Sequence, residues 1–170
     1  KQLASRKKKD LTMNHWLEIS KQNLLHNFKA ISEILYKHNI FWVLKSNAYG
    51  HGLQEVYQVL SECNPSCLSV NDVYEARSLR KMGFQKRILI LGPVLQKDFT
   101  QALKQKAELT VGSPELLADW LQTKDKPSIH LKIDTGLTRQ GFYPQQLPAI
   151  TTTTLYSQKE KILGLMTHFA

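Results

Sequence analysis

The sequence predicts an α/β fold, a parallel (β/α)8 barrel of the TIM type with about six of its βα units present. Two observations lead to this prediction. Short apolar runs typical of buried strands alternate with segments in which apolar residues recur every three or four positions. The strands follow one another at intervals of about 20 to 33 residues, which suits one helix between each pair. Because such a barrel needs about 250 residues, we expect these 170 to be a fragment of a longer protein.

Seven segments have the composition of strands. The first, Trp16–Ser20, alternates apolar and polar residues, which indicates a short strand ahead of the barrel. The others are largely apolar runs, as in buried strands. We predict these six barrel strands at Phe41–Lys45, Cys67–Val70, Arg87–Leu91, Glu108–Val111, Ile129–Asp134 and Lys161–Met166.

Six segments have helical periodicity. In the first, apolar residues from Leu24 to Leu35 recur at three- and four-residue steps. Gly83 is expected to end the helix after the second strand. Ser113 and Pro114 open the helix after the fourth strand, because serine caps a helix N-terminus and proline lacks only an N–H that the first turn does not use. We predict helices at Gln22–His38, Leu53–Leu60, Val73–Met82, Lys97–Lys106, Ser113–Leu121 and, more weakly, Gln145–Tyr156.

The composition is that of a globular chain, with 42% hydrophobic and 22% charged residues. No apolar run reaches the roughly 18 residues of a membrane span, so we expect no membrane association. The net charge is +9, but five positive charges lie within the first nine residues, which lack the apolar segment of a secretory signal. We therefore divide the chain into a basic leader or linker at 1–13 and the barrel portion at 14–170, and we expect no nucleic-acid partner.

The two cysteines, Cys63 and Cys67, are expected to be free thiols of a cytoplasmic protein. Their spacing is not the C-x-x-C of a redox or zinc site, and no second pair completes a metal cage. We therefore predict no metal.

The candidate reactive groups follow the strands, because a barrel of this kind carries its reactive side chains at the carboxyl ends of the strands. Lys45 ends the first barrel strand, Arg139 follows the fifth, and His168 follows the sixth. Each alone would usually be a surface cation. Lys45 differs because it emerges from four apolar residues, and a dry environment favours the neutral amine that can attack a carbonyl or abstract a proton.

The fifth strand, I-H-L-K-I-D, alternates in character. Ile129, Leu131 and Ile133 are expected to face the helices, so His130, Lys132 and Asp134 should point into the barrel. A lysine inside a barrel needs a counter-charge or must lose its proton, and pairing with Asp134 is the simplest explanation for it.

Three motifs together resemble the signatures of alanine racemases, which are fold-type III enzymes that depend on pyridoxal 5′-phosphate. They are V-L-K-S-N-A-Y-G-H-G at Val43–Gly52, H-L-K-I-D-T-G-L-T-R-Q-G at His130–Gly141 and G-L-M-T-H-F-A at Gly164–Ala170. The opening W-L-E-I-S-K-Q-N-L-L-H-N is also similar, so the resemblance extends from about Trp16 to Ala170. It implies a cytoplasmic homodimer that makes D-alanine from L-alanine for peptidoglycan.

The resemblance also implies roles for single residues. Lys45 would hold pyridoxal 5′-phosphate covalently and act as the base on one face of the substrate. Tyr49 would bind the cofactor phosphate, and Arg139 the cofactor's phenolic oxygen and the substrate carboxylate. Lys132 matches a position that is often carbamylated, and His168 would tune the second catalytic group. That group, a tyrosine, lies in a C-terminal β-domain that this sequence does not contain.

Two alternatives remain open at this point. The chain could belong to another group of lysine-bearing pyridoxal phosphate barrels, the amino-acid decarboxylases or the cofactor carriers, although the Y-G-H-G turn and the D-T-G-x-x-R-x-G signature favour the racemases. It could also be an inactive half-barrel that closes its sheet against itself or a partner.

Overall fold

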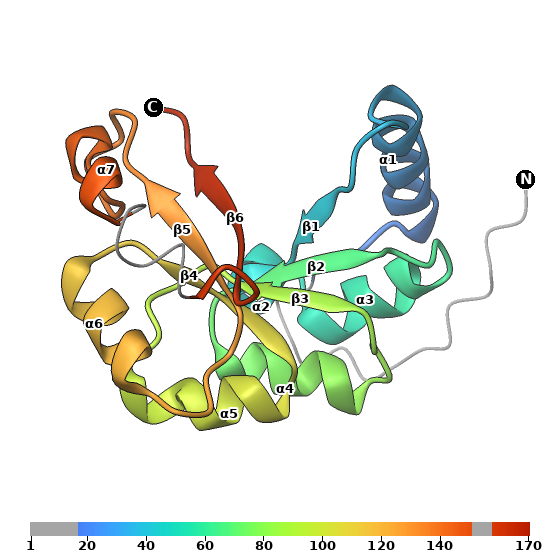
Figure 1. Cartoon of the computed structure of the whole chain (residues 1–170). Helices are drawn as coiled ribbons and strands as arrows, with labels where there is room; N and C mark the ends of the chain where they lie inside the picture. The colour runs from blue at the N-terminus through green and yellow to red at the C-terminus, as the bar shows by residue number, and fades with distance from the viewer. Residues whose placement is uncertain (1–16, 151–157) are drawn as a thin grey trace, which may run out of the picture.

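A computed structural model describes residues 17–150 and 158–170. Its six strands form one parallel sheet in which each strand pairs with its neighbours in the sequence. The sheet is strongly curved, with β1 at one edge and β6 at the other (Figure 1). The strands are β1 (Phe41–Val43), β2 (Cys67–Val70), β3 (Arg87–Ile90), β4 (Ala107–Val111), β5 (Ile129–Ile133) and β6 (Ile162–Thr167). The fold is the predicted barrel architecture, present as a half-barrel.

The helices cover the outer face of this sheet. In Figure 1, α3, α4, α5 and α6 follow one another along that face, while α1 lies beside β1 and α7 beside β5. The helices are α1 (Lys21–Ile34), α2 (Lys45–Tyr49), α3 (Leu53–Ser61), α4 (Val73–Lys81), α5 (Phe99–Lys104), α6 (Pro114–Gln122) and α7 (Leu147–Ile150), with 3₁₀ turns at Gln96–Asp98 and Pro144–Gln146. Within the described part of the chain, no helix is long and apolar enough to cross a membrane.

The core lies between the sheet and these helices. Alternate side chains of β2 to β5 point outward into it and are fully buried, among them Leu68, Val70, Ile88, Ile90, Leu109, Val111, Ile129 and Leu131. Trp120 of α6 completes this layer and donates from its indole nitrogen to the Pro127 carbonyl at 2.8 Å. The other set of side chains faces the concave side of the sheet and is more polar.

Local capping explains where several helices begin. The Ser20 hydroxyl accepts a hydrogen bond from the Asn23 N–H, and the Ser113 hydroxyl accepts one from the Leu116 N–H. Asp72 accepts from two backbone N–H groups of α4. Gly83, just past the end of α4, has φ +98°, so a residue without a side chain suits it. The predicted cap at Ser113 and the predicted stop at Gly83 are confirmed.

The structure corrects some expected boundaries. Leu17–Ser20 forms no strand and leads into the Ser20 cap, while Trp16 and the leader lie outside the described residues. The first helix ends at Ile34 rather than His38, and the helix expected at Lys97–Lys106 is divided between a 3₁₀ turn and α5. In the helix expected at Gln145–Tyr156, a 3₁₀ turn precedes α7, and residues 151–156 lie outside the described residues.

Candidate functional site

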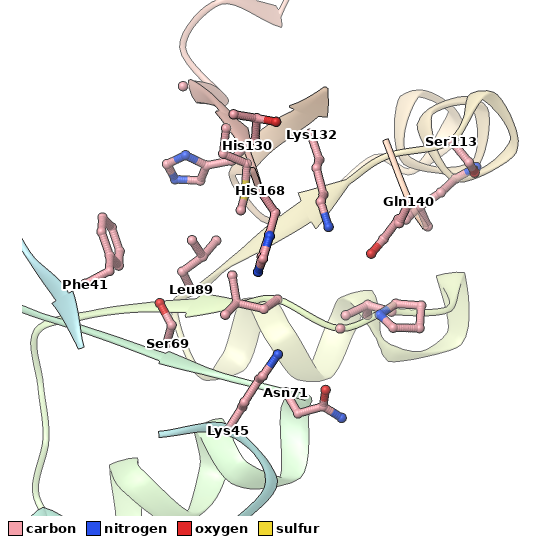
Figure 2. Close-up of a pocket in the computed structure, with 18 of the residues that line it drawn as sticks. Phe41, Lys45, Ser69, Asn71, Leu89, Ser113, His130, Lys132, Gln140 and His168 are labelled. Atoms are coloured by element: carbon pink, nitrogen blue, oxygen red, sulfur yellow. The ribbon is translucent and has the colours of Figure 1, made fainter. Parts of the chain in front are cut away.

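The concave side of the sheet holds a cavity of about 1210 Å³. Side chains from β1, β2, β3, β5 and β6 line it, together with the loops that follow the strands. Figure 2 shows Lys45 pointing into this space from one side, with Lys132 and His168 pointing into it from the other. Arg139 also lines the cavity. The structure thus brings four of the five predicted site residues together.

Lys45 does not end its strand as expected. β1 ends at Val43, although the Leu44 N–H still donates to the Ser69 carbonyl at 2.7 Å, and Lys45 begins the short helix α2. Its side chain is half-buried and lines the cavity. The pairing of Leu44 with β2 fixes the backbone immediately before the lysine, so its position is set by the sheet.

The turn after Lys45 is left-handed. Ser46, Asn47, Ala48 and Tyr49 all have φ between 52° and 56°, although none is glycine. A left-handed backbone costs roughly 1–2 kcal/mol for each such residue, so the surrounding structure must hold it. Within the turn, the Ala48 N–H donates to the Leu44 carbonyl at 2.9 Å, and the Asn47 side-chain oxygen accepts from the Leu53 N–H at 2.8 Å.

Tyr49 lies outside the cavity. Its side chain is 60% exposed and is not among the residues that line the space. The Lys45 ammonium group lies 6.0 Å from the centre of the Tyr49 ring, which places the tyrosine beside the lysine and on the solvent side. Among the predicted site residues, Tyr49 is therefore the one that the described structure does not bring into the cavity.

Lys132 is buried and faces the cavity, as the alternation of β5 predicted. Burial lowers the pKa of its ammonium group, and the positive charges of Arg139 and Lys45 lower that pKa further, against the opposing effect of Asp134. Lys45, Lys132 and Arg139 all line the same cavity, so their positive charges act on one another. The neutral amine is therefore more accessible at Lys132 than at an exposed lysine.

Asp134 is not the ion-pair partner expected for Lys132. Its carboxylate accepts hydrogen bonds from the N–H groups of Gly136 at 2.9 Å and Thr138 at 3.0 Å, which lower its pKa. No ion pair joins it to Lys132 in the described part of the chain. The reason is local, because an aspartate at a strand end can satisfy the N–H groups of the loop that follows.

This loop carries Arg139 and folds back onto β5. The Phe142 N–H donates to the Lys132 carbonyl at 2.8 Å, and the Asp134 N–H donates to the Phe142 carbonyl at 2.9 Å. Gly141 passes so close to β5 that a Cβ there would lie 2.5 Å from the Asp134 nitrogen. Close backbone packing therefore requires the glycine of the predicted motif. The same packing holds the loop that carries Arg139 next to β5 and the cavity.

His168 lies just beyond β6 and is exposed, with its Nδ1 atom 2.8 Å from the Phe169 carbonyl oxygen. Its ring points toward the side of the cavity that carries Lys45 (Figure 2). Among the described residues, no group of three or more histidine, cysteine, aspartate or glutamate side chains could hold a metal ion.

A polar cluster inside the barrel was not predicted. Glu108 accepts two hydrogen bonds from the Arg87 guanidinium, at 2.7 and 2.9 Å, and its Oε2 lies 2.7 Å from His130 Nε2. Burial alone would raise the pKa of Glu108, but the hydrogen bonds and charges of His130 and Arg87 outweigh it, so this pKa lies below its usual value. The alternation of the strands could have predicted this cluster, since Arg87, Glu108 and His130 occupy inward positions on three successive strands.

Ser69 is a second cavity residue that was not predicted from the sequence. Its hydroxyl oxygen lines the cavity side of β2, is buried, and has no hydrogen-bond partner among the residues that the structure describes. A buried hydroxyl without a partner is costly, so this atom is available to a polar group in the cavity.

A family model described as "Alanine racemase, N-terminal domain" matches residues 19–170. The chain belongs to this family. It is 36% identical to an alanine racemase of Fusobacterium nucleatum over 76% of this chain and 37% of that protein. It is also 34% identical to a lysine racemase of Oenococcus oeni, over 91% of this chain and 43% of that protein.

A solved structure gives the same result. The crystal structure of alanine racemase from Bacillus anthracis with bound L-Ala-P matches with a TM-score of 0.80 and 28% identity, covering 91% of this chain and 42% of that one. The chain thus spans about two fifths of the length of these racemases, and what it matches is their N-terminal barrel region.

Proposed function

We propose that this chain is the cofactor-binding part of an alanine racemase, an isomerase that uses pyridoxal 5′-phosphate to interconvert L-alanine and D-alanine. The observation that carries the proposal is the convergence of Lys45, Lys132 and Arg139 on one cavity in a member of this family. We further propose that the complete enzyme is a cytoplasmic homodimer that supplies D-alanine for peptidoglycan.

The residues of the cavity fit the cofactor. A planar anionic aldehyde needs an amine to bind covalently, a cation for its oxygen atoms and apolar walls for its ring. Lys45 offers the amine, Arg139 the cation and Leu89 part of the wall. The unpartnered Ser69 hydroxyl offers one further hydrogen bond.

When bound, the cofactor supplies a conjugated ring that spreads the negative charge left on a substrate carbon after a proton has been removed. Lys45 would hold the cofactor and move the proton at the α-carbon of the amino acid on one face. Arg139 would hold the substrate carboxylate by a charge-assisted hydrogen bond. The sheet would exclude water from this side of the site, which strengthens both interactions.

Lys132 is proposed to be carbamylated. Its neutral amine would attack carbon dioxide, forming a C–N bond and releasing one proton, and the resulting carbamate anion would face the Arg139 guanidinium. The lowered pKa of Lys132 supports this step, because only the unprotonated amine can react. Mass spectrometry of the intact protein would detect the added mass of carbon dioxide, which a Lys132→Met variant would lack.

Two assignments rest on the family alone. His168 is proposed to tune the second catalytic group, and its position at the cavity is compatible with that role. Tyr49 is proposed to bind the cofactor phosphate, which would require its exposed side chain to turn from solvent toward the cavity.

The function is tested by absorbance and by product. The protein that carries this chain should show the visible absorbance of covalently bound pyridoxal phosphate and should form D-alanine from L-alanine. Lys45→Arg keeps the charge and removes the reactive amine, so it should abolish both. Lys104→Ala, on the exposed end of α5 outside the cavity, should leave both unchanged. A Lys45→Arg variant that retained the band and the activity would refute the assignment.

The substrate is tested separately, because a lysine racemase is among the relatives. L-Alanine, L-serine and L-lysine should be offered in parallel, with chiral analysis of each product. We expect alanine to have the highest kcat/KM. Release of carbon dioxide in place of a D-amino acid would instead identify a decarboxylase.

A further inference from the structure

Glu75, in the first turn of α4, contacts the backbone at two separate places. One carboxylate oxygen accepts a hydrogen bond from the Asn47 N–H at 2.7 Å, and the other accepts one from the Asn71 N–H at 2.8 Å. Asn47 lies two residues after Lys45, within the left-handed turn, and Asn71 is the first residue after β2. A single side chain therefore links the Lys45 turn to the neighbouring strand.

This arrangement differs from ordinary helix capping. Asp72 is the N-cap of α4, and an acidic residue three positions later usually bonds back to the N–H of the cap residue. Here Asp72 accepts from the Tyr74 and Glu75 N–H groups, at 2.9 and 3.0 Å, while the Glu75 carboxylate accepts from Asn47 and from Asn71, the residue before the cap. The positive end of the helix dipole favours a carboxylate at this position.

The left-handed turn has little else to hold it from outside. Ser46, Asn47 and Tyr49 are exposed, and only Ala48 is buried. The other hydrogen bonds of this turn among the described residues, including those of Asn47 and His51, join it to residues between Leu44 and Leu53. Among the described residues, the Glu75 carboxylate is therefore the polar group that ties residues 46–49 to a distant part of the sequence.

We propose that Glu75 is a positioning residue that fixes the left-handed turn after Lys45 to the end of β2 and so keeps the Lys45 amine aimed into the cavity. It acts through the backbone and needs no contact with substrate or cofactor. The inference deepens the proposed function and rests on Lys45 being the reactive amine. The two hydrogen bonds that Glu75 accepts from Asn47 and Asn71, which we call the Glu75 clamp, can nevertheless be measured without the cofactor.

The test compares Glu75→Gln with Asp72→Ala in the protein that carries this chain. Glutamine has almost the same shape, yet its NH₂ group cannot accept from the second N–H, so one bond of the clamp must fail. Asp72→Ala is the matched control, because it removes two hydrogen bonds from the same helix turn and leaves the Glu75 carboxylate in place. Both variants should lower the melting temperature slightly.

Two measurements follow. Hydrogen exchange of the peptide that covers residues 46–53 should be at least about tenfold faster in Glu75→Gln and nearly unchanged in Asp72→Ala. With alanine as substrate, kcat should fall about tenfold or more in Glu75→Gln while KM changes less than about twofold, because the substrate contacts are retained. In Asp72→Ala, kcat should stay close to that of the unmodified protein.

The proposal is overturned if exchange in that peptide is unaltered in Glu75→Gln, or if Asp72→Ala accelerates it equally. It is also overturned if exchange rises but kcat does not fall, since the clamp would then not position Lys45. A protein that binds no pyridoxal phosphate would refute the proposed function and the role assigned to Glu75 in it, while the exchange measurement would still decide whether the clamp exists.

Discussion

At Lys132, the burial that suits the proposed carbamylation is also expected to lower the stability of the folded protein. Its side chain is buried, and among the described residues its ammonium group has no hydrogen-bond or ion-pair partner. Lys126 is a second buried lysine, but it donates to the Leu121 carbonyl at 2.8 Å and lies 4.7 Å from the centre of the Trp120 ring. The two lysines therefore form a natural pair for comparison.

We predict that Lys132→Met raises the free energy of unfolding by about 1–3 kcal/mol at pH 7 in buffer free of bicarbonate, since a buried charge without a partner is removed. The same change should abolish racemisation. Lys126→Met should instead lower stability by about 1 kcal/mol, because a hydrogen bond and a cation–π contact are lost. Urea unfolding measures both, and a loss of stability in Lys132→Met would contradict the prediction.

The increase in the free energy of unfolding caused by Lys132→Met should also depend on pH. Because the pKa of Lys132 is lower in the folded state, the unfolded chain binds more protons between that pKa and the usual value of 10.5. The stability of the unmodified protein relative to the variant therefore rises with pH through this window. Unfolding measured at pH 7 and pH 9.5 should show a smaller difference at the higher pH, and a constant difference would exclude this cause.

Among the elements, the loop after β5 packs very closely against backbone atoms near the site. A Cβ at Gly141 would meet the Asp134 nitrogen at 2.5 Å and the Ile133 carbonyl carbon at 2.8 Å, at a φ of +143°. Neither backbone atom can move without disturbing the hydrogen bond between the Asp134 N–H and the Phe142 carbonyl. The loop is consequently intolerant of a side chain at this position.

We predict that Gly141→Ala destabilises the protein by about 2–4 kcal/mol. Gly83→Ala is the control, because Gly83 also has positive φ, at +98°, but nothing lies within 4 Å of an added Cβ. Its cost should stay near 1 kcal/mol. Since the loop carries Arg139, Gly141→Ala should also raise KM for alanine. Equal losses of stability in the two variants would show that the clash is relieved.

The helices and strands could be predicted from the sequence, but not the orientation of every site residue. The alternation of strands and helices was predictable, because each amphipathic segment buries its apolar face against the next. Lys45, Lys132, Arg139 and His168 were predictable as a group, since the carboxyl ends of parallel strands meet at one edge. The orientation of Tyr49 was not, because the left-handed turn that contains it has no glycine, and the Asn47 N–H of that turn bonds to Glu75, 28 residues beyond Asn47.

At the scale of the whole molecule, β1 and β6 are the two edges of the sheet, and neither has a further strand beside it among residues 17–150 and 158–170. Val43, Leu163 and Leu165 expose 38%, 46% and 60% of their surface there. Unpaired edge strands with exposed apolar side chains favour association with other chains. The hypothesis of a half-barrel that closes its sheet against itself or a partner can therefore be tested on the 170-residue chain.

We predict that the 170-residue chain self-associates at micromolar concentration, and that the double change Leu163→Lys and Leu165→Lys lowers the associated fraction at least about tenfold. The double change Leu103→Lys and Leu121→Lys, at leucines of α5 and α6 that expose 36% and 38% of their surface, should have little effect. Size-exclusion chromatography with light scattering measures the mass with and without pyridoxal phosphate. A monomeric unmodified chain would contradict the prediction.

The pairing of every strand with its neighbours in the sequence has a consequence for how the molecule is made. Each βα unit can pack against the unit synthesised just before it. The pairing of a strand with its preceding neighbour therefore does not depend on segments that are translated much later. We expect compact intermediates to appear in the order of translation, growing by one unit at a time from the amino end.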